Sequence, residues 1–295
     1  TAPNYDGFPL DLYLSPEPVL PVQFSRGCYY KDCAFCALTL DHQNFRQRDP
    51  GKTVDDLVWL KERYGAQSFF FTDECFALSP TKRLCQQMID RQVNVKWTCE
   101  LRFEKNLTRE LLGQMRDAGC LKIVFGLESF NQRVMDFMKK GIKQESVRRI
   151  VDDCVDLGIA VHCYVIVGFP TEKEEEALDT MNFVVGNKKL HESYGFSCQP
   201  CLFDLEKEAP IMSDPGSYGI RRIMRPATED LSLGFFYEVQ EGMTPAQAEQ
   251  LYQQVYEKIS EVVCELPFNY SMADGLLYIA RAKSQAVQVP QPTGP

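Results

Sequence analysis

The sequence predicts an α/β protein: a partial (β/α)6 barrel, open on one side, followed by a C-terminal extension made of a loop and helices. Strand-like and helix-like segments alternate between residues 19 and 201, which implies right-handed crossovers and a parallel sheet. Runs such as Phe-Phe-Phe at 69–71 are apolar on both faces, as parallel strands covered by helices must be. Six strand–helix units are fewer than the eight that close a barrel, so we expect an incomplete one.

Each element is predicted from its own residues. Short apolar runs indicate strands, and apolar residues at helical spacing indicate helices. Thr53 is the expected N-cap of the first helix, Ser79 the expected cap of the second, and Gly119 the glycine that ends the third. The expected strands cover residues 19–25, 67–72, 94–99, 121–126, 159–168 and 193–201, and the expected helices cover 53–64, a segment from 79, 108–118, 131–140, 144–157, 172–185 and 244–266.

The chain divides into four expected regions. Residues 1–20 are rich in proline and form an extended lead-in, residues 21–201 form the barrel, residues 202–285 form the extension, and residues 286–295 form a disordered tail. Within the extension, residues 202–243 lose their periodicity, and a loop of that length is commonly functional. We expect the substrate to enter between this loop and the open side of the barrel.

The composition of the chain excludes several classes of protein. Its 32 basic and 41 acidic side chains give a net charge of 32 − 41 = −9, which argues against a nucleic-acid-binding protein. The longest uncharged apolar run, residues 159–170, is too short to cross a bilayer, and no signal peptide opens the chain. The 12 cysteines are mostly isolated, as buried thiols in a reducing compartment are. We expect a cytoplasmic protein with no nucleic-acid and no membrane partner.

The strongest chemical signal is the segment Arg-Gly-Cys-Tyr-Tyr-Lys-Asp-Cys-Ala-Phe-Cys at 26–36, directly after the first strand. Cys28 and Cys33 would diverge on a helix, so all three sulfur atoms, including that of Cys36, converge only in a loop. Three thiolates leave one position of a four-iron cluster open, whereas structural zinc takes four ligands. A zinc site completed by a distant ligand is the alternative; a chance group of core cysteines is disfavoured because Lys31 and Asp32 lie within the run.

This loop resembles the cluster-binding loop of the radical S-adenosylmethionine (radical SAM) superfamily, including an aromatic residue, Phe35, before the last cysteine. It departs from the commonest pattern, because four residues rather than three separate Cys28 from Cys33. The resemblance implies a [4Fe–4S] cluster on the three cysteines and SAM on the open iron. It also implies that one electron cleaves SAM to a 5′-deoxyadenosyl radical, which removes a hydrogen atom from a substrate.

Two further matches to the superfamily follow the second and third strands. Asp73 and Glu74 resemble the acidic stretch that holds the amino group of SAM, although carboxylates at a helix N-terminus are a common alternative. Arg102 is placed to pair with the carboxylate of SAM, and a surface salt bridge is the alternative.

Two more matches follow the fourth and fifth strands. Glu128 and Ser129 lie in a Gly-Leu-Glu-Ser turn that in the superfamily meets the ribose, and Ser129 is equally suited to cap a helix. Gly168 opens a turn that resembles the one beside the adenine, with Thr171 in place of the usual second glycine. The resemblance covers residues 20–200, with its motifs in the expected order at successive strand ends.

Residues 13–21 resemble the segment that joins a cobalamin-binding domain to a radical SAM core, and residues 203–215 are similar to the C-terminal region of the same enzymes. These enzymes are cobalamin-associated methyltransferases, many of which modify peptides or natural products. Only 12 residues precede this segment here, so we expect that the cobalamin domain was cut away or that the enzyme works without one. The resemblance implies [4Fe–4S], SAM and cobalamin as cofactors, a small-molecule or peptide substrate, and an electron donor such as flavodoxin or ferredoxin.

Three alternatives stay open. A cobalamin-free radical SAM enzyme would cross-link or epimerise a peptide. An iron–sulfur electron carrier or a zinc scaffold would need a fourth protein ligand, and Cys198 with Cys201 is the one pair placed to supply it or to bind an auxiliary cluster. Two strand-end core cysteines are the simpler interpretation of that pair. Tyr30 and His42 are candidates to face the substrate, or else pack beside the loop.

Overall fold

The computed structural model describes residues 2–13, 17–38, 44–192, 196–225 and 234–262. Its centre is a six-stranded parallel sheet in the order β1-β4-β5-β6-β7-β8. Within the described residues β1 and β8 are the two edges of this sheet, so the barrel is partial, as the sequence predicts. The strands are β1 (Val19–Val22), β4 (Ser68–Phe71), β5 (Lys96–Leu101), β6 (Cys120–Glu128), β7 (Ala160–Val167) and β8 (Ser197–Leu202).

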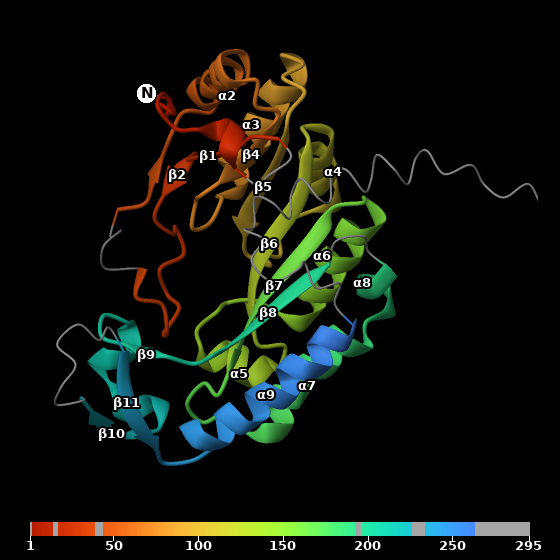
Figure 1. Ribbon diagram of the computed structural model, residues 1–295. Coiled ribbons are helices and arrows are strands. Elements are labelled where there is room, and N and C mark those ends of the chain that lie inside the picture. Colours follow the sequence, from red (N-terminus) through yellow and green to blue (C-terminus); the bar gives the residue numbers. More distant parts are fainter. Residues whose placement is uncertain (1, 14–16, 39–43, 193–195, 226–233, 263–295) are drawn as a thin grey trace, which may run out of the picture.

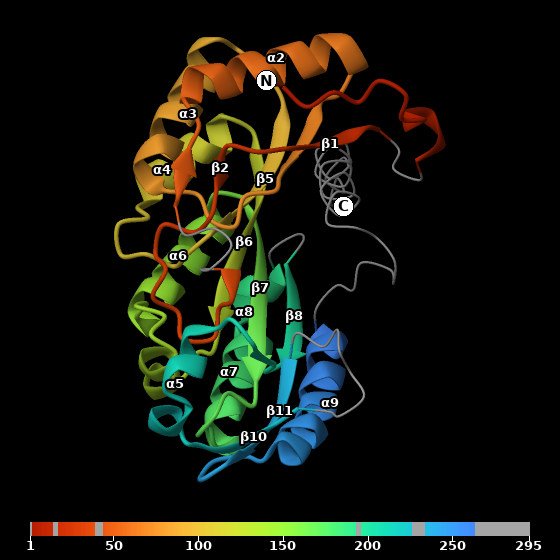
Figure 2. The same cartoon turned by 90° about the vertical axis from the view of Figure 1, so that its left-hand side faces the viewer.

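Helices connect consecutive strands of this sheet and cover its outer face (Figures 1 and 2). This arrangement explains the continuous apolar runs in the strands, because the outer face packs against helices while the inner face lines the barrel. The connecting helices are α2 (Pro50–Tyr64), α3 (Leu78–Asp90), α4 (Arg109–Asp117), α5 (Gln132–Phe137), α6 (Gln144–Asp156), α7 (Glu174–Gly186) and α8 (Lys188–Glu192). A short 3-10 helix, η1 (Leu10–Leu12), lies in the lead-in.

Two helix starts differ from the sequence-based expectation. Asp49, not Thr53, caps α2: its side chain accepts a hydrogen bond from the backbone N–H of Lys52, and Pro50 occupies the first turn. Helix α3 begins at Leu78, with Ala77 at the cap position, so Ser79 lies inside its first turn. In both cases the helix extends one to three residues further towards the N-terminus than its apolar periodicity indicates.

The main core lies between the sheet and its helices. Trp97 on β5 is fully buried and packs against Phe71 and Phe76. Gly119, the residue before β6, has φ +99°, and a Cβ built there would lie 2.0 Å from the carbonyl oxygen of Val95. Only glycine fits at this crossing, which explains why α4 ends there.

The extension builds a second, smaller core where the sequence predicts a long loop. It contains the antiparallel sheet β10-β11-β9 and the helix α9, which packs against α7 and β8. The elements are β9 (Leu205–Glu206), η2 (Pro210–Ser213), η3 (Pro215–Tyr218), β10 (Ile220–Met224), β11 (Gly234–Val239) and α9 (Pro245–Val262). Strands as short as β9 show no periodicity, so the sequence pattern misses them. The expected helix beyond residue 262 and the expected tail lie outside the described residues.

None of the helices within the described ranges combines the length and the apolar character needed to cross a membrane. The 11 cysteines in the same ranges are free thiols.

Candidate cofactor site at the cysteine loop

The three cysteines of the loop lie between the barrel and the extension. The loop follows β2 (Ser25–Arg26), which pairs antiparallel with β3 (Arg46–Gln47). Cys33 is buried, whereas Cys28 and Cys36 are half-buried. The N–H of Ala34 donates to the carbonyl of Met138, and the N–H of Ile211 donates to the carbonyl of Ala34. The end of α5 and the extension therefore hold the loop from two sides (Figure 1).

Asp73 and Glu74, at the end of β4, hold the backbone that leads into Cys28. The Asp73 carboxylate accepts hydrogen bonds from the N–H of Phe24 at 2.9 Å and from the N–H and hydroxyl of Ser25. The Glu74 carboxylate accepts from the N–H of Gly27 at 2.9 Å. Burial raises the pKa of Asp73 to about 6, and these donors oppose that shift. Both acids thus have backbone partners next to the loop, and their contact with the SAM amino group stays a prediction.

Arg102 follows β5 and reaches under the loop. Its Nη1 lies 3.7 Å from the Sγ of Cys33, and its guanidinium lies 3.5 Å from the ring centroid of Tyr30. Its Nη2 also donates to the carbonyl of Lys140. Its Nε also forms an ion pair with the Oε1 of Glu104 at 3.5 Å. Only 5% of Arg102 is exposed, so this is a buried cation beside the Cys33 thiol rather than a surface side chain. Pairing with the SAM carboxylate stays a prediction.

Cys75 is a fourth cysteine at the loop, although its isolated position in the sequence predicts only a buried thiol. It lies two residues after Asp73 and is buried. A hydrogen bond from the Cys75 thiol is the main cause that lowers the pKa of Cys28 to about 6, and burial opposes it. This contact favours the thiolate form of Cys28, which is the form that binds metal. Burial has the opposite effect on Cys36, whose pKa rises to about 11.

Lys140 is a second buried cation at the loop, and no sequence signal singles it out. Its Nζ lies 2.8 Å from the Oε1 of Glu128 and 5.4 Å from the ring centroid of Phe35. Burial lowers the pKa of Lys140, and the negative charges of Glu128 and Cys33 more than offset this, so the pKa is raised. A Cβ at Gly126 would lie 2.6 Å from the Glu128 carboxylate and 2.7 Å from the Lys140 ammonium group. Glycine at this place in β6 makes room for the ion pair.

Ser129 and Gly168 make contacts within the fold. The hydroxyl of Ser129 accepts a hydrogen bond from the N–H of Asn131 and lies 3.2 Å from the hydroxyl of Thr180. Ser129 therefore helps to order the start of α5, since Asn131 is the N-cap of that helix. Gly168 has φ +86°, and its N–H donates to the Glu172 carboxylate at 2.7 Å. Contacts of Glu128 and Ser129 with the ribose and of Gly168 with adenine stay predictions.

The buried Glu172 carboxyl gives a testable pH dependence. Burial raises its pKa to about 8, and its Oε1 has no hydrogen-bond partner among the described residues. The unfolded chain binds fewer protons at this position between about pH 4.3 and 8, so stability falls as pH rises, by about 1.4 kcal/mol per pH unit. Glu172→Gln keeps an acceptor for Gly168 and should remove this part of the slope in urea unfolding at pH 5 and pH 8. Glu175→Gln, an exposed position on α7, is the matched control; equal slopes in both variants would contradict the assignment.

The inner face of the sheet is polar. Burial, with a smaller contribution from Glu128, raises the pKa of Glu100 to about 7. Lys122 donates to the hydroxyl of Ser197 at 2.9 Å, and this hydroxyl lies 2.8 Å from the Nδ1 of His162. Burial lowers the pKa of Lys122 to about 8 and that of His162 to about 3, so His162 is neutral. Glu100, Lys122, His162 and Ser197 lie on four neighbouring strands, β5 to β8, and line the inside of the barrel.

The remaining predicted residues are placed as follows. Cys198 and Cys201 are three residues apart on β8, so they face opposite sides of the sheet: Cys198 packs against the core, and Cys201 is exposed. The Tyr30 hydroxyl donates to the carbonyl of Lys139, which fixes this ring beside the loop. His42 lies outside the described residues.

The donor set fits an iron–sulfur cluster. Within the described part of the chain, no three side chains of His, Cys, Asp or Glu are gathered around a point that would hold a single metal ion. A cluster needs a different arrangement, because its irons take separate thiolates. Cys28 favours the thiolate form, and the buried cations Arg102 and Lys140 compensate negative charge beside Cys33.

A family model described as "Radical SAM superfamily" matches residues 22–184, which is more than half of the chain. The chain belongs to the radical SAM superfamily. Membership implies a [4Fe–4S] cluster and SAM as cofactors, and an enzyme as the function class. The family match includes the cysteine loop and the strands β4, β5, β6 and β7 of the sheet.

Curated relatives are named mainly as methyltransferases. The chain is 29% identical over 196 residues to the uncharacterized methyltransferase PH0819 of Pyrococcus horikoshii, covering 65% of this chain and 42% of the relative. It is 28% identical over 172 residues to the cytidylyl-2-hydroxyethylphosphonate methyltransferase of Streptomyces wedmorensis, covering 55% and 32%. An anaerobic magnesium-protoporphyrin IX monomethyl ester cyclase of Rubrivivax gelatinosus is 30% identical over 160 residues, covering 53% and 29%. The chain thus spans less than half the length of these relatives.

Solved radical SAM enzymes share the fold. The methyltransferase TsrM of Kitasatospora setae, solved with cobalamin and a [4Fe–4S] cluster, matches with a TM-score of 0.60 at 16% identity, covering 92% of this chain and 61% of that one. OxsB, a cobalamin-dependent radical SAM enzyme solved with aqua-cobalamin, matches with a TM-score of 0.63 at 15% identity, covering 79% and 40%.

Proposed function

We propose that the protein is a cobalamin-dependent radical SAM methyltransferase that adds a methyl group to a carbon atom of a peptide or other natural product. The observation that carries the proposal is the loop of Cys28, Cys33 and Cys36 beside two buried cations, in a chain whose relatives are named as methyltransferases. The cobalamin in the TsrM and OxsB structures and the lead-in at residues 13–21 support this subfamily.

Each residue of the loop region has a task in this proposal. The three cysteines hold the cluster and leave one iron for SAM. When bound, the cluster and SAM together supply a 5′-deoxyadenosyl radical, formed as one electron breaks the C5′–S bond and methionine leaves. Arg102 and Lys140 stabilise negative charge at Cys33. The contact of Ala34 with the extension closes the loop on that side and helps to exclude water.

The substrate belongs on the inner face of the sheet, where the polar side chains lie. The TsrM structure with tryptophan bound supports a small molecule or a peptide side chain as the substrate class. Glu100 is the inner-face group best suited to exchange a proton near neutral pH, since its pKa lies at about 7.

Anaerobic reconstitution with iron and sulfide, followed by reductant and SAM, tests the proposed function. We expect 5′-deoxyadenosine from SAM, and methylated product that requires added methylcobalamin. The absence of 5′-deoxyadenosine from a protein that holds its full iron content would overturn the radical chemistry. A product formed equally well without cobalamin would favour a cross-linking or epimerising enzyme instead.

A further inference from the structure

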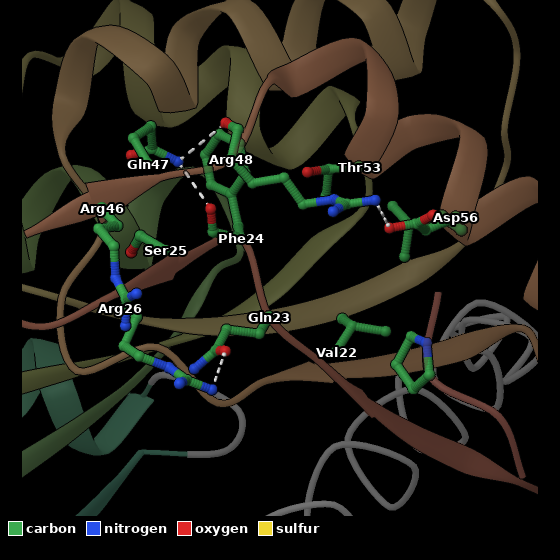
Figure 3. A pocket seen from close by; sticks show the side chains of 12 residues that line it. Val22, Gln23, Phe24, Ser25, Arg26, Arg46, Gln47, Arg48, Thr53 and Asp56 are labelled. Carbon is green, nitrogen blue, oxygen red and sulfur yellow. Dashed lines mark hydrogen bonds and ion pairs between the residues drawn. The ribbon is translucent and has the colours of Figure 1, made fainter. Parts of the chain in front are cut away.

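A basic cavity of about 460 Å³ lies outside the barrel, between the β2–β3 hairpin and the start of α2 (Figure 3). Three arginines line it: Arg26 on β2, Arg46 on β3, and Arg48 just after β3. Asp56 is the one acidic residue in this lining. The local charge is therefore +3 − 1 = +2, in a chain whose net charge is −9.

The three arginines do not have the same role. Arg48 forms an ion pair with Asp56 at 2.6 Å, and their side chains are 30% and 19% exposed, so Arg48 belongs to the wall of the cavity. Arg26 and Arg46 are exposed and carry the remaining charge. The side chain of Arg26 is oriented by a hydrogen bond from its Nη2 to the Oε1 of Gln23 (Figure 3).

Arg26 and Arg46 are direct partners in the β2–β3 ladder. Two like charges placed opposite each other on paired strands destabilise the pair. Folding alone gives no reason to put arginine at both positions, since most residues with a good strand propensity would stabilise the hairpin more. The arrangement instead presents a concentrated positive charge to solvent, and an anionic partner would relieve the repulsion.

The same hairpin leads directly into the cysteine loop. Arg26 is two residues before Cys28, so their Cα atoms are at most about 7 Å apart. The backbone between them is fixed, because the N–H of Gly27 donates to the Glu74 carboxylate. A molecule bound against Arg26 and Arg46 would therefore lie next to the loop that holds the cluster, and electron transfer requires a short distance between donor and acceptor.

We propose that Arg26 and Arg46 form the docking surface for an acidic protein carrier of one electron. The inference rests on the proposed function, which requires an external electron for each cleavage of SAM. The reduced carrier loses one electron and the oxidised cluster gains it, with no bond made or broken in the carrier. Transient redox complexes are small, and complementary charge speeds their formation.

The test compares the reconstituted double variant Arg26→Glu/Arg46→Glu with the wild type. Flavodoxin is the probe: calorimetry measures the binding of its oxidised form, and stopped-flow absorbance measures the reduction of the cluster by its reduced form. We expect both affinity and rate to fall by about tenfold or more in the variant, while reduction by dithionite is unchanged. Rising salt should weaken binding to the wild type and change little in the variant. Arg83→Glu, an exposed arginine on α3, should behave as the wild type.

The double variant Arg26→Lys/Arg46→Lys keeps the charge and should keep most of the affinity, which also covers the case in which charge reversal prevents folding. Unchanged flavodoxin binding after charge reversal would overturn the proposal. So would equal slowing with dithionite and flavodoxin, because that result would make the arginines part of the cluster's support. If no variant forms 5′-deoxyadenosine even with dithionite, the proposed function fails. The docking surface is still tested in that case, because flavodoxin binding and cluster reduction are measured without SAM cleavage.

Discussion

Alanine at Cys28, Cys33 or Cys36, introduced one at a time, should abolish cluster binding after anaerobic reconstitution and reduce SAM cleavage to background. In the proposed site each thiolate would ligate its own iron, so we expect no neighbouring side chain to replace it. The measurements are iron and sulfide content, the absorbance of the cluster, and 5′-deoxyadenosine formed in the presence of dithionite. The Cys28 variant is the most informative of the three, because Cys28 already favours the thiolate form through its contact with Cys75.

Cys75→Ala is the decisive companion to this series. Cys75 is buried beneath Cys28 and its pKa is raised well above the usual value, mainly by its hydrogen bond to Cys28 and by burial. We therefore expect it to donate to a ligand rather than to be one, so Cys75→Ala should keep its full iron content. Cys201→Ala, at an exposed thiol, is a matched control. Loss of iron in the Cys75 variant would mean four protein ligands, which would leave no iron open for SAM and would overturn the proposed radical chemistry.

The sequence predicts the barrel well because its signals are local. Buried strands such as β4 and β7 are continuous apolar runs, and glycines such as Gly119 end helices where close packing leaves no room for a side chain. The small sheet of the extension lacks such local signals. Its strand β9 has only two residues, and the pairing of β9 with β11 joins segments far apart in sequence. The start of α2 was missed because Asp49 and Pro50 precede the apolar stripe.

The candidate site likewise combines residues that the sequence reveals with contacts that form only on folding. Three cysteines within nine residues are visible in the sequence, whereas the contacts of Cys75 and Lys140 with the loop exist only after folding. Asp73 illustrates a second limit. Its position after β4 is predicted correctly, but the residue type does not reveal that its oxygens accept hydrogen bonds from Phe24 and Ser25. Pattern therefore identifies which strand end a residue belongs to, and packing decides what that residue contacts.

The buried pair of Glu128 and Lys140 should give the largest loss of stability. The Lys140 ammonium group and the Glu128 carboxylate are 2.8 Å apart, with side chains only 7% and 10% exposed. Glu128→Ala leaves the ammonium group buried without its partner, and removing one member of such a pair costs about 3–5 kcal/mol. Urea unfolding of the apoprotein measures this loss without interference from the cofactors. Asp136→Ala provides the comparison, since Asp136 pairs with Lys143 at the surface, with side chains 52% and 60% exposed, and should cost less than about 1 kcal/mol.

The double variant Glu128→Gln/Lys140→Met separates the loss of the pair from the cost of an unpaired charge. Because it removes both charges and keeps similar volumes, most of the stability lost in Glu128→Ala should return. Its effect on the loop should be different: without Lys140 a cation beside Cys33 and Phe35 is missing, so the cluster should bind less firmly although the fold is stable. If Glu128→Ala costs no more than Asp136→Ala, the ammonium group has another acceptor, and the pair does not hold β6 against the cysteine loop.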